Sequence, residues 1–346
     1  MNKVIEEDII EISKSFNSEI FKNKTILISG ASGFLPAYLV DYFLYQNKIN
    51  TSQNTIVIGI VRDMKKAERR FKHWKNFNFL KLFAQDVSEY FNYNDKIDFI
   101  IHAASQASPK FYGIDPVGTL SPNILGTYNL LKLASEKKCS SFLFFSSGEV
   151  YGQLNKSEDK INEDSYGIID PLNLRSCYSE SKKMGENICI SWSNQFNINC
   201  KIVRPFHTYG PGMSLNDGRV FADFVSNVVN KKDIIINGDG KAIRSYCYIK
   251  DATIGFLKVL IQGNNREAYN IGNPSQTFNV LELANIILEL SDKSKTNIIF
   301  KNIKGKGYLK SEYLKVVPNI KKINTLNWYP KTTVREGFKR TIQSFK

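Results

Sequence analysis

The alternation of short apolar segments with segments suited to helices is the feature that most constrains the fold of this chain. Through the first 210 residues it predicts strands at 25–29, 55–61, 79–83, 97–101, 141–145 and 200–203, and helices at 34–46, 116–137 and 174–194. Strands that are apolar along their length and alternate with helices are typical of a parallel sheet covered on both faces. We therefore expect an α/β fold with a Rossmann-type doubly wound sheet.

The pattern loosens after residue 210, where short strands at 234–236, 246–249 and 268–271 mix with short helices. A chain of 346 residues is long enough for two lobes. We expect a helical extension over 1–23, a dinucleotide-binding domain over 24–210, and a smaller α/β substrate-binding lobe over 211–346, from which some chain returns to the first domain. An amphipathic segment at 6–16 predicts an extra N-terminal helix.

Composition limits the location and the partners. No apolar run approaches the roughly 20 residues that a membrane span needs, and the N-terminus lacks the pattern of a secretory signal. The five cysteines are scattered without a C-x-x-C pair, which indicates neither a zinc site nor a disulfide framework. We expect a cytoplasmic protein with no membrane partner.

The net charge of +14 raises the hypothesis of nucleic-acid binding. The lysines and arginines are dispersed and mostly have acids nearby, and no nucleic-acid motif accompanies them, so we expect no nucleic-acid partner. The positive net charge is better explained by the solvation of surface lysines and some attraction for a doubly anionic substrate than by nucleic-acid binding. His73, His102 and His207 lack Ser, Asp or metal-ligand partners at a suitable spacing, so we expect neither a hydrolase triad nor a metal site.

A glycine turn, Gly30-Ala-Ser-Gly33, lies between the first strand and the first long helix. Glycines there permit a tight turn and close approach of the backbone to a pyrophosphate, which binds at the helix N-terminus. The third position of the pattern is Pro36, which a first helical turn tolerates. The pattern predicts a dinucleotide cofactor held at the turn by Gly30, Ser32, Gly33, Phe34 and Leu35.

Residues that follow the next strands are candidates for the rest of the cofactor. At the end of the second strand, Asp63 favours NAD, because an acid binds the ribose 2′-hydroxyl, whereas Arg62 favours NADP, so NAD is expected and NADP stays open. After the third and fourth strands, we expect contacts to the adenine and to the pyrophosphate and ribose from Asp86, Val87, Ala103, Ala104 and Ser105.

Tyr178 and Lys182 lie one turn apart on a predicted helix. An ammonium beside a phenol favours the phenolate and lowers its pKa, so Tyr178 could take a proton from a sugar hydroxyl while hydride leaves the same carbon. The fifth strand delivers Ser147 and Glu149 to the same sheet edge, where Ser147 could bind the substrate hydroxyl and Glu149 could remove an acidic C–H next to a ketone. These residues, with Tyr178 and Lys182 also touching the cofactor, predict reversible oxidation of an alcohol.

The motifs continue in order along almost the whole chain after residue 24. They include His102-Ala-Ala-Ser-Gln-Ala-Ser-Pro109, Glu149-Val-Tyr-Gly152, Arg175-Ser-Cys-Tyr178, Thr208-Tyr-Gly-Pro211 and Gly238-Asp-Gly-Lys241. In these stretches the chain resembles the extended short-chain dehydrogenase/reductase family of NAD-dependent epimerases and dehydratases, above all the UDP-glucuronate decarboxylases among its nucleotide-sugar members.

The resemblance implies a tightly bound cofactor and a nucleotide diphosphate sugar between the lobes, oxidised at C4. It implies substrate contacts from Ser108, His207, Arg219, Val220 and Arg244, with the arginines on phosphate or on an acidic end of the sugar. It also implies a homodimer through a four-helix bundle and, at family level, a place in polysaccharide assembly.

Three positions depart from the family pattern. Gly148 stands where decarboxylases carry Ser and dehydratases carry Asp or Ser, His207 where Asn is usual, and Gly212 where decarboxylases carry Arg. Glycine cannot protonate a departing centre. We therefore expect net oxidation to a 4-keto sugar or epimerisation, with a decarboxylase or 4,6-dehydratase as the alternative and a non-catalytic dinucleotide sensor as a third reading.

Overall fold

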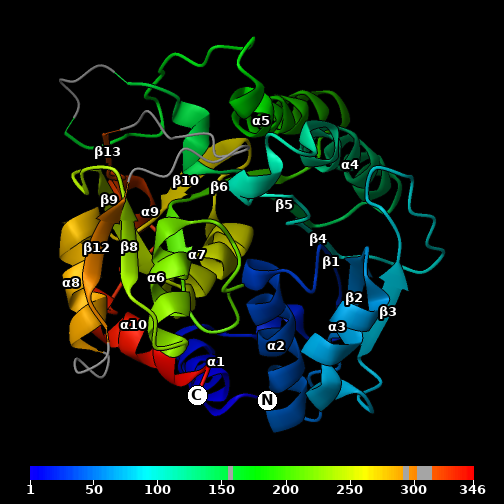
Figure 1. The fold of residues 1–346 in the computed structure, drawn as a ribbon. Helices are drawn as coiled ribbons and strands as arrows, with labels where there is room; N and C mark the ends of the chain where they lie inside the picture. Colours follow the sequence, from blue (N-terminus) through cyan, green and yellow to red (C-terminus); the bar gives the residue numbers. More distant parts are fainter. Residues whose placement is uncertain (155–158, 291–295, 302–313) are drawn as a thin grey trace.

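The computed structural model describes residues 1–154, 159–290, 296–301 and 314–346, which form two lobes (Figure 1). The larger lobe is built on a seven-stranded parallel sheet in the order β10-β6-β5-β4-β1-β2-β3. Its strands are β1 (Thr25–Ser29), β2 (Ile56–Val61), β3 (Leu80–Ala84), β4 (Phe99–His102), β5 (Ser141–Phe145), β6 (Cys200–Pro205) and β10 (Glu267–Ile271). The predicted doubly wound α/β fold is confirmed.

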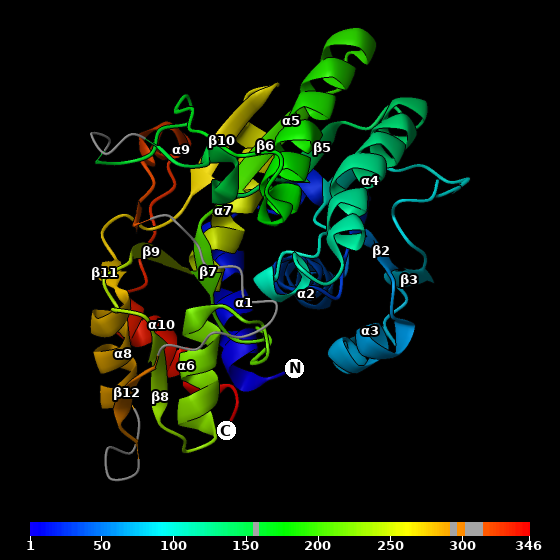
Figure 2. The same ribbon diagram turned by 45° about the horizontal axis from the view of Figure 1, so that its top comes forward.

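Helices cover both faces of this sheet, as the apolar strands require. Along β1, Ile26 and Ile28 pack into one apolar core and Leu27 into the other, because successive side chains of a strand point to opposite faces. On the Leu27 face, α4 (Pro116–Glu136) and α5 (Cys177–Phe196) lie side by side (Figure 2). The other face carries α2 (Phe34–Ile49), α3 (Met64–Arg70) and α7 (Ile249–Gln262).

The smaller lobe has a four-stranded sheet, in which β9 pairs with its three other strands, and a separate two-stranded sheet. The strands are β7 (His207–Tyr209), β9 (Ile243–Tyr248), β11 (Thr277–Asn279) and β13 (Lys315–Val316), and β8 (Ile234–Asn237) with β12 (Ile298–Lys301). Its helices are α6 (Val220–Val229), α8 (Val280–Glu289) and α10 (Val334–Gln343), whereas α9 (Lys321–Asn324) packs against β10 of the large sheet.

The chain crosses between the lobes in both directions. Strand β7 precedes residue 210 but pairs with β9 of the smaller lobe, whereas β10 follows residue 210 and pairs with β6 at the edge of the large sheet. The segment 268–271, expected from sequence among the strands of the smaller lobe, therefore lies in the large sheet. Pairing between distant strands leaves no local sequence signal.

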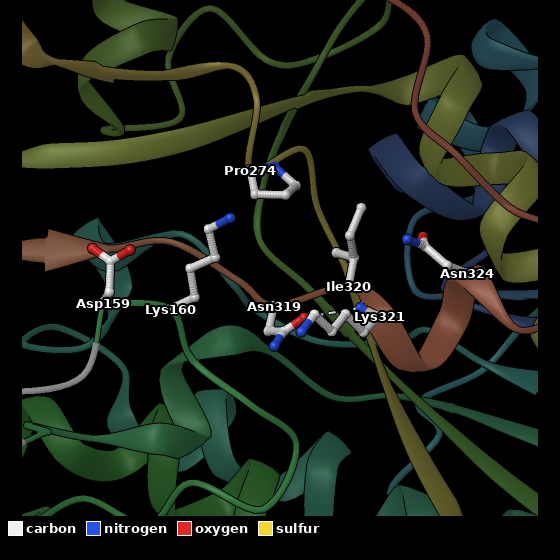
Figure 3. Close-up of a pocket in the computed structure, with 7 residues that line it drawn as sticks. All are labelled: Asp159, Lys160, Pro274, Asn319, Ile320, Lys321 and Asn324. Atoms are coloured by element: carbon white, nitrogen blue, oxygen red, sulfur yellow. Dashed lines mark hydrogen bonds between the residues drawn. The ribbon is translucent and has the colours of Figure 1, made fainter.

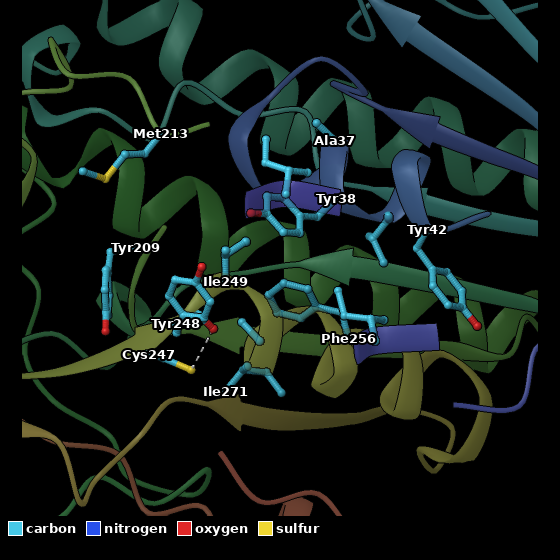
Figure 4. Packing of buried hydrophobic residues seen from close by; sticks show 14 of the residues in the cluster. Ala37, Tyr38, Tyr42, Tyr209, Met213, Cys247, Tyr248, Ile249, Phe256 and Ile271 are labelled. Carbon is cyan, nitrogen blue, oxygen red and sulfur yellow. Dashed lines mark hydrogen bonds between the residues drawn. The ribbon is translucent and has the colours of Figure 1, made fainter. Parts of the chain in front are cut away.

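Helix α1 (Lys3–Ser15) ties the lobes together. Its apolar residues Ile5, Ile9 and Ile12 are buried, and it packs on α2 and α7. The carboxylate of Asp8 is fully buried and accepts hydrogen bonds from Tyr38 of α2 (3.1 Å), Tyr248 of β9 (2.7 Å) and Arg340 of α10 (2.8 Å). Figure 4 shows Tyr38 and Tyr248 in this core with the Phe256 ring of α7.

Candidate active site

The glycine turn lies where the sequence predicts it, between β1 and α2. Gly30 has φ +66°, and a Cβ there would lie 2.7 Å from Ala104 Cα, so only glycine lets the turn rest on the segment after β4. Gly33 caps α2 without a side-chain hydrogen bond, and Phe34 and Leu35 form the first turn. Backbone N–H groups at such a helix start suit a phosphate.

A buried Ser–His contact fixes the two loops against each other. Ser29 Oγ accepts hydrogen bonds from the backbone N–H of Ala103 and of Ala104, both at 3.1 Å, and lies 2.7 Å from His102 Nδ1. His102 Nε2 lies 3.0 Å from the Pro122 carbonyl. Because that carbonyl only accepts, Nε2 carries the hydrogen and Ser29 donates to Nδ1.

Burial lowers the pKa of His102 to about 3, so the ring is neutral. Its contact with Ser29 means that the expectation that the histidines lack partners is wrong for His102. It is also wrong for His73, whose Nε2 lies 2.9 Å from Asp41 Oδ1. Both contacts join residues far apart in sequence. A polar residue at the end of the apolar strand Thr25–Ser29 is the only signal that could have identified Ser29.

The other predicted cofactor residues line the same sheet edge. Ser105 Oγ is buried and has no hydrogen-bond partner among the described residues. Arg62 is exposed and donates to Gln106 Oε1 at 3.4 Å. Asp63 accepts from the Lys66 N–H at 2.9 Å and so caps α3.

After β3, the predicted pair Asp86 and Val87 divides between two roles. The Asp86 carboxylate accepts from the Ser88 N–H at 2.8 Å. Val87 is buried, and a Cβ on Gly126 of α4 would lie 2.8 Å from its side chain. Asp86 thus closes a turn, and Val87 packs against α4.

Tyr178, Lys182 and Ser147 converge at the carboxyl end of β5. Ser147 begins the short helix η4 (Gly148–Tyr151), and its Oγ accepts from the Glu149 N–H at 3.1 Å. Burial raises the pKa of Tyr178 to about 12, although a hydrogen bond with Ser147 and the charge of Arg219 oppose the rise. Burial lowers the pKa of Lys182 to about 7.

The expected depression of the Tyr178 pKa by Lys182 is not what this geometry gives. Lys182 Nζ donates to the Phe145 carbonyl at 2.5 Å and lies 5.8 Å from the Tyr178 ring centroid. Desolvation therefore outweighs the attraction between the two groups. The residues meet as predicted, but burial sets their protonation.

Tyr112 and Arg175 connect Tyr178 with Glu149. The Tyr112 ring is buried and stacks on Tyr178, with centroids 5.2 Å apart and planes at 14°. Arg175 Nη1 lies 3.2 Å from Glu149 Oε2, and its guanidinium lies 5.9 Å from the Tyr112 centroid. Sequence reasoning missed Tyr112 as a partner of Tyr178, because the two rings come from distant segments.

The predicted substrate residues Ser108 and Arg219 meet at the start of α6. Ser108 Oγ donates to the backbone carbonyl of Asp217, whose carboxylate pairs with Arg219 Nε. Gly218 between them has φ +81°. Arg219 caps α6, of which Val220 is the first residue, and its charge acts on Tyr178.

His207 and Arg244 come from adjacent strands, β7 and β9. His207 Nδ1 is buried without a hydrogen-bond partner in the described part of the chain, and burial together with Arg244 and Arg219 holds the His207 pKa well below its usual value. Arg244 donates to the carbonyls of Ile243 (2.8 Å) and Leu314 (3.3 Å). A neutral imidazole thus lies close to two guanidinium groups.

The two glycine departures have different surroundings. A Cβ on Gly148 would lie 3.2 Å from three atoms of the Phe206 ring, so the ring would have to yield by a few tenths of an ångström. Gly212 has φ +84°, which favours glycine, and a Cβ there would meet only Ile5, at 3.9 Å. Phe206 thus packs where a side chain at position 148 would begin.

Two cavities lie beside the loop at 159–166. The cavity in Figure 3 has a volume of about 460 Å³ and is lined by Asp159, Lys160, Pro274, Asn319, Ile320, Lys321 and Asn324. A second, of about 770 Å³, shares Asn319 and Lys321 and reaches Glu186 and Arg204. Across 1–154, 159–290, 296–301 and 314–346, we find no group of three or more His, Cys, Asp or Glu side chains that could hold a metal ion.

The same described ranges contain no helix long and apolar enough to cross a membrane.

Residues 26–272 match the model of the NAD dependent epimerase/dehydratase family. UDP-glucuronic acid decarboxylase 1 of Arabidopsis thaliana is 34% identical over 332 residues, which cover 94% of this chain and 70% of that protein. UDP-glucuronic acid decarboxylase 3 of the same plant is 32% identical, with 94% and 90% covered.

Among solved structures, UDP-glucuronic acid 4-epimerase from Bacillus cereus superposes with a TM-score of 0.76 at 22% identity, over 93% of this chain and 98% of that one. A dTDP-glucose 4,6-dehydratase from Bacillus anthracis gives 0.74 at 20% identity, over 93% and 96%. These structures support the fold, and the family model and the plant relatives confirm the resemblance found in the sequence. The chain belongs to the NAD-dependent epimerase/dehydratase family of nucleotide-sugar enzymes.

Proposed function

We propose that this enzyme oxidises the C4 hydroxyl of a nucleotide diphosphate sugar. The observation that carries the proposal is the convergence of Ser147, Tyr178 and Lys182 at the carboxyl end of β5. Tyr178 takes the hydroxyl proton as general base, Ser147 orients that hydroxyl, and Lys182 stabilises the phenolate. A bound nicotinamide dinucleotide supplies the acceptor for the hydride from C4.

The residues present fit such a cofactor. The turn at Gly30 and Gly33 offers backbone N–H groups to a pyrophosphate, and the unpartnered buried Oγ of Ser105 offers a polar contact beside it. Arg62 and Asp63 both stand at the end of β2, so NAD is proposed and NADP stays open. Ala103 and Ala104 leave room there because their side chains are small.

Arg219, Arg244 and His207 are proposed to bind the diphosphate and the acidic end of the sugar. Two guanidinium groups near a neutral imidazole suit a doubly anionic ligand, because guanidinium donors match phosphate oxygens. Ser108 and Val220 border this position. Similar plant proteins are UDP-glucuronic acid decarboxylases, which supports UDP-glucuronate as the first substrate to test.

Position 148 favours a net oxidation to a 4-keto sugar or an epimerisation. Gly148 has no side chain to donate a proton, and Phe206 packs against it. Glu149, held by Arg175 at 3.2 Å, is the proposed base for a C–H next to the ketone.

Decarboxylation is the second candidate, because the similar plant proteins that cover 94% of this chain are UDP-glucuronic acid decarboxylases. The C4 ketone would then promote loss of carbon dioxide from the sugar acid, with water in place of the missing side chain at position 148. The groups that act on the C4 hydroxyl are the same in both candidates.

Product mass separates the candidates. The enzyme is incubated with NAD and UDP-glucuronate, UDP-glucose or dTDP-glucose in deuterated water. A product lighter by two hydrogens, or one that incorporates deuterium at unchanged connectivity, supports oxidation or epimerisation, and loss of carbon dioxide or water supports a lyase. Tyr178→Phe should abolish cofactor reduction, whereas Tyr166→Phe, at a 90% exposed tyrosine, should not. Full activity of Tyr178→Phe would refute the mechanism, and turnover of any sugar nucleotide would exclude a non-catalytic sensor.

We also propose a homodimer through α4 and α5. Both helices expose apolar side chains, namely Leu125, Tyr128, Met184 and Phe196. Trp192 lies between Tyr128 and Phe196, with ring centroids 5.1 Å and 4.6 Å away. An exposed apolar face on two adjacent helices supports a four-helix bundle with a second copy. Light scattering should give twice the monomer mass, and Leu125→Glu should give monomers.

The five free thiols agree with the proposed cytoplasmic location.

A further inference from the structure

The last residue of β5 and the residue that follows it are held by two successive turns of α5. Lys182 Nζ donates to the carbonyl of Phe145 at 2.5 Å, and the next residue, Ser146, donates from Oγ to Glu186 Oε1 at 2.5 Å. Lys182 and Glu186 are four residues apart and therefore neighbours on one helix face. One helix face thus anchors both the catalytic ammonium and the loop that carries Ser147.

Glu186 is locked in this position by Arg204 of β6. The guanidinium donates from Nε to Glu186 Oε1 at 2.8 Å and from Nη2 to Oε2 at 2.6 Å, a two-fold contact that fixes the plane of the carboxylate. Arg204 Nη1 also donates at 2.8 Å to the Tyr151 hydroxyl, at the end of η4. The pair therefore joins α5, β6 and both ends of the catalytic loop.

The charges around Lys182 single out Glu186. On α5, Lys182 faces the Tyr178 phenol, the Glu186 carboxylate and the Cys189 thiol, and on β4 it faces the neutral His102 ring. Burial raises the pKa of Tyr178 and of Cys189, so both are uncharged at neutral pH. Burial lowers the pKa of Lys182 to about 7, and the negative charge of Glu186 is the strongest influence that opposes this lowering.

We propose that Glu186, held by Arg204, is a positioning residue that keeps the Lys182 ammonium charged and directed at the end of β5. The opposing charges of Glu186 and Arg204 then set the pH range in which Tyr178 can act as base. The proposal rests on the proposed function only for its consequence in catalysis. Lys182 must carry its proton to stabilise the Tyr178 phenolate. The carboxylate offsets part of the cost of burying that charge, and the guanidinium limits how much it offsets.

The cavity of about 770 Å³ gives the pair access to water on the side away from the catalytic loop, since Glu186 and Arg204 both line it. Their side chains are still only 13% and 12% exposed. A substitution there changes a charge close to Lys182 without entering the face where Ser147 and Tyr178 meet.

The test changes the two charges in opposite directions. Glu186→Gln removes the anion and keeps the shape, Arg204→Gln removes the cation, and Glu186→Asp keeps the charge. Glu180→Gln on the same helix is the control, because Glu180 makes no hydrogen bond or ion pair within the described part of the chain. The titration of Lys182 is followed by the NMR shift of its Cε carbon, assigned by the loss of that signal in Lys182→Met.

Glu186→Gln should lower the titration midpoint of Lys182 by about one pH unit, and Arg204→Gln should raise it by a similar amount. Glu186→Asp should lie near the wild type, and Glu180→Gln should not differ from it. Unchanged midpoints, or shifts of the same sign in both Gln variants, would overturn the proposal. Loss of folding in both Gln variants would also overturn it, because the pair would then be purely structural.

The pH profile of kcat, with whichever sugar nucleotide the wild type converts, gives the catalytic consequence. The alkaline limb, where Lys182 loses its proton, should move to lower pH and the maximum should fall several-fold in Glu186→Gln, with recovery in Glu186→Asp. A uniform loss at all pH values would indicate a structural role alone. The lysine titration needs no substrate, so a failure of the proposed function, seen as no turnover by the wild type, is distinguishable from a failure of this proposal.

Discussion

Replacing Lys201 with methionine should stabilise the protein at neutral pH. Lys201 lies on β6, is 3% exposed, and donates to Ser141 Oγ at 2.9 Å and to the Leu260 carbonyl at 3.1 Å. Burial lowers its pKa from 10.5 to about 8. A lysine with a lowered pKa in the folded state destabilises that state fully below the folded pKa, and this cost disappears as the pH rises towards the unfolded value.

The magnitude follows from these values. The difference between 10.5 and about 8, at about 1.4 kcal/mol per pH unit, makes the cost of the buried charge at most about 3 kcal/mol at pH 7. Methionine has a similar length but gives up two hydrogen bonds, worth about 1 kcal/mol each at most. Ser141 Oγ still donates to the Leu260 carbonyl at 3.0 Å, so that carbonyl keeps a partner. We expect a net gain of about 1 to 2 kcal/mol.

Urea unfolding at pH 7 and pH 9.5 checks this expectation. The free energy of unfolding of Lys201→Met should exceed that of the wild type at pH 7. The advantage should shrink by about 2 kcal/mol at pH 9.5, where the folded wild type has lost the buried charge. Lys232→Met, at an exposed lysine, should stay within about 0.5 kcal/mol of the wild type at both pH values. A destabilised Lys201→Met at pH 7, or an advantage that does not shrink, would refute the reasoning.

Three further changes test other parts of the structure. Gly30→Ala should weaken NAD binding at least tenfold in calorimetry, because its Cβ would lie 2.7 Å from backbone, whereas Gly238→Ala, also at positive φ but with open space around it, should bind normally. Arg340→Met leaves the fully buried carboxylate of Asp8 without its cation, so the free energy of unfolding in urea should fall by about 3 to 5 kcal/mol at pH 7. Part of that loss should return as the pH falls, because protonation neutralises the carboxyl; an equal loss at all pH values would contradict this account. Tyr112→Leu should lower kcat about tenfold with little change in KM, because it loses the stacking on Tyr178, the proposed base, and Tyr112→Phe should retain activity; equal effects of both variants would contradict the stacking argument.

Local sequence patterns predict the elements that build the cofactor domain. The predicted strands at 25–29 and 141–145 coincide with β1 and β5, because apolar runs bounded by polar residues define a buried strand. The helix predicted at 116–137 ends one residue earlier, at Glu136. The strand predicted at 246–249 instead spans Ile243–Tyr248, since the polar Arg244 and Ser245 hid its start. What the sequence did not predict is the pairing of β10 with β6.

The candidate site divides in the same way. Motifs identify Gly30, Ser147, Tyr178 and Lys182, because spacing on a turn or a helix is a local property. Their partners come from distant segments and have no fixed spacing, among them Ser29 for His102, Tyr112 for Tyr178 and Glu186 with Arg204 for Ser146. The direction of the Tyr178 pKa was also beyond reach, since it depends on burial and not on the neighbouring lysine alone.

Packing at position 148 bears on how the reaction ends. Phe206 is buried in one apolar cluster with Val150, Tyr151 and Ile161, and its ring centroid lies 6.1 Å from that of Tyr151. A side chain at position 148 would therefore have to be accommodated by a ring that is packed on several sides. The groups proposed to act on the C4 hydroxyl are present, and no side-chain acid stands at position 148. Glu149 on the same loop is the base proposed for a C–H next to the ketone, and Arg175, whose Nη1 lies 3.2 Å from Glu149 Oε2, holds that carboxylate.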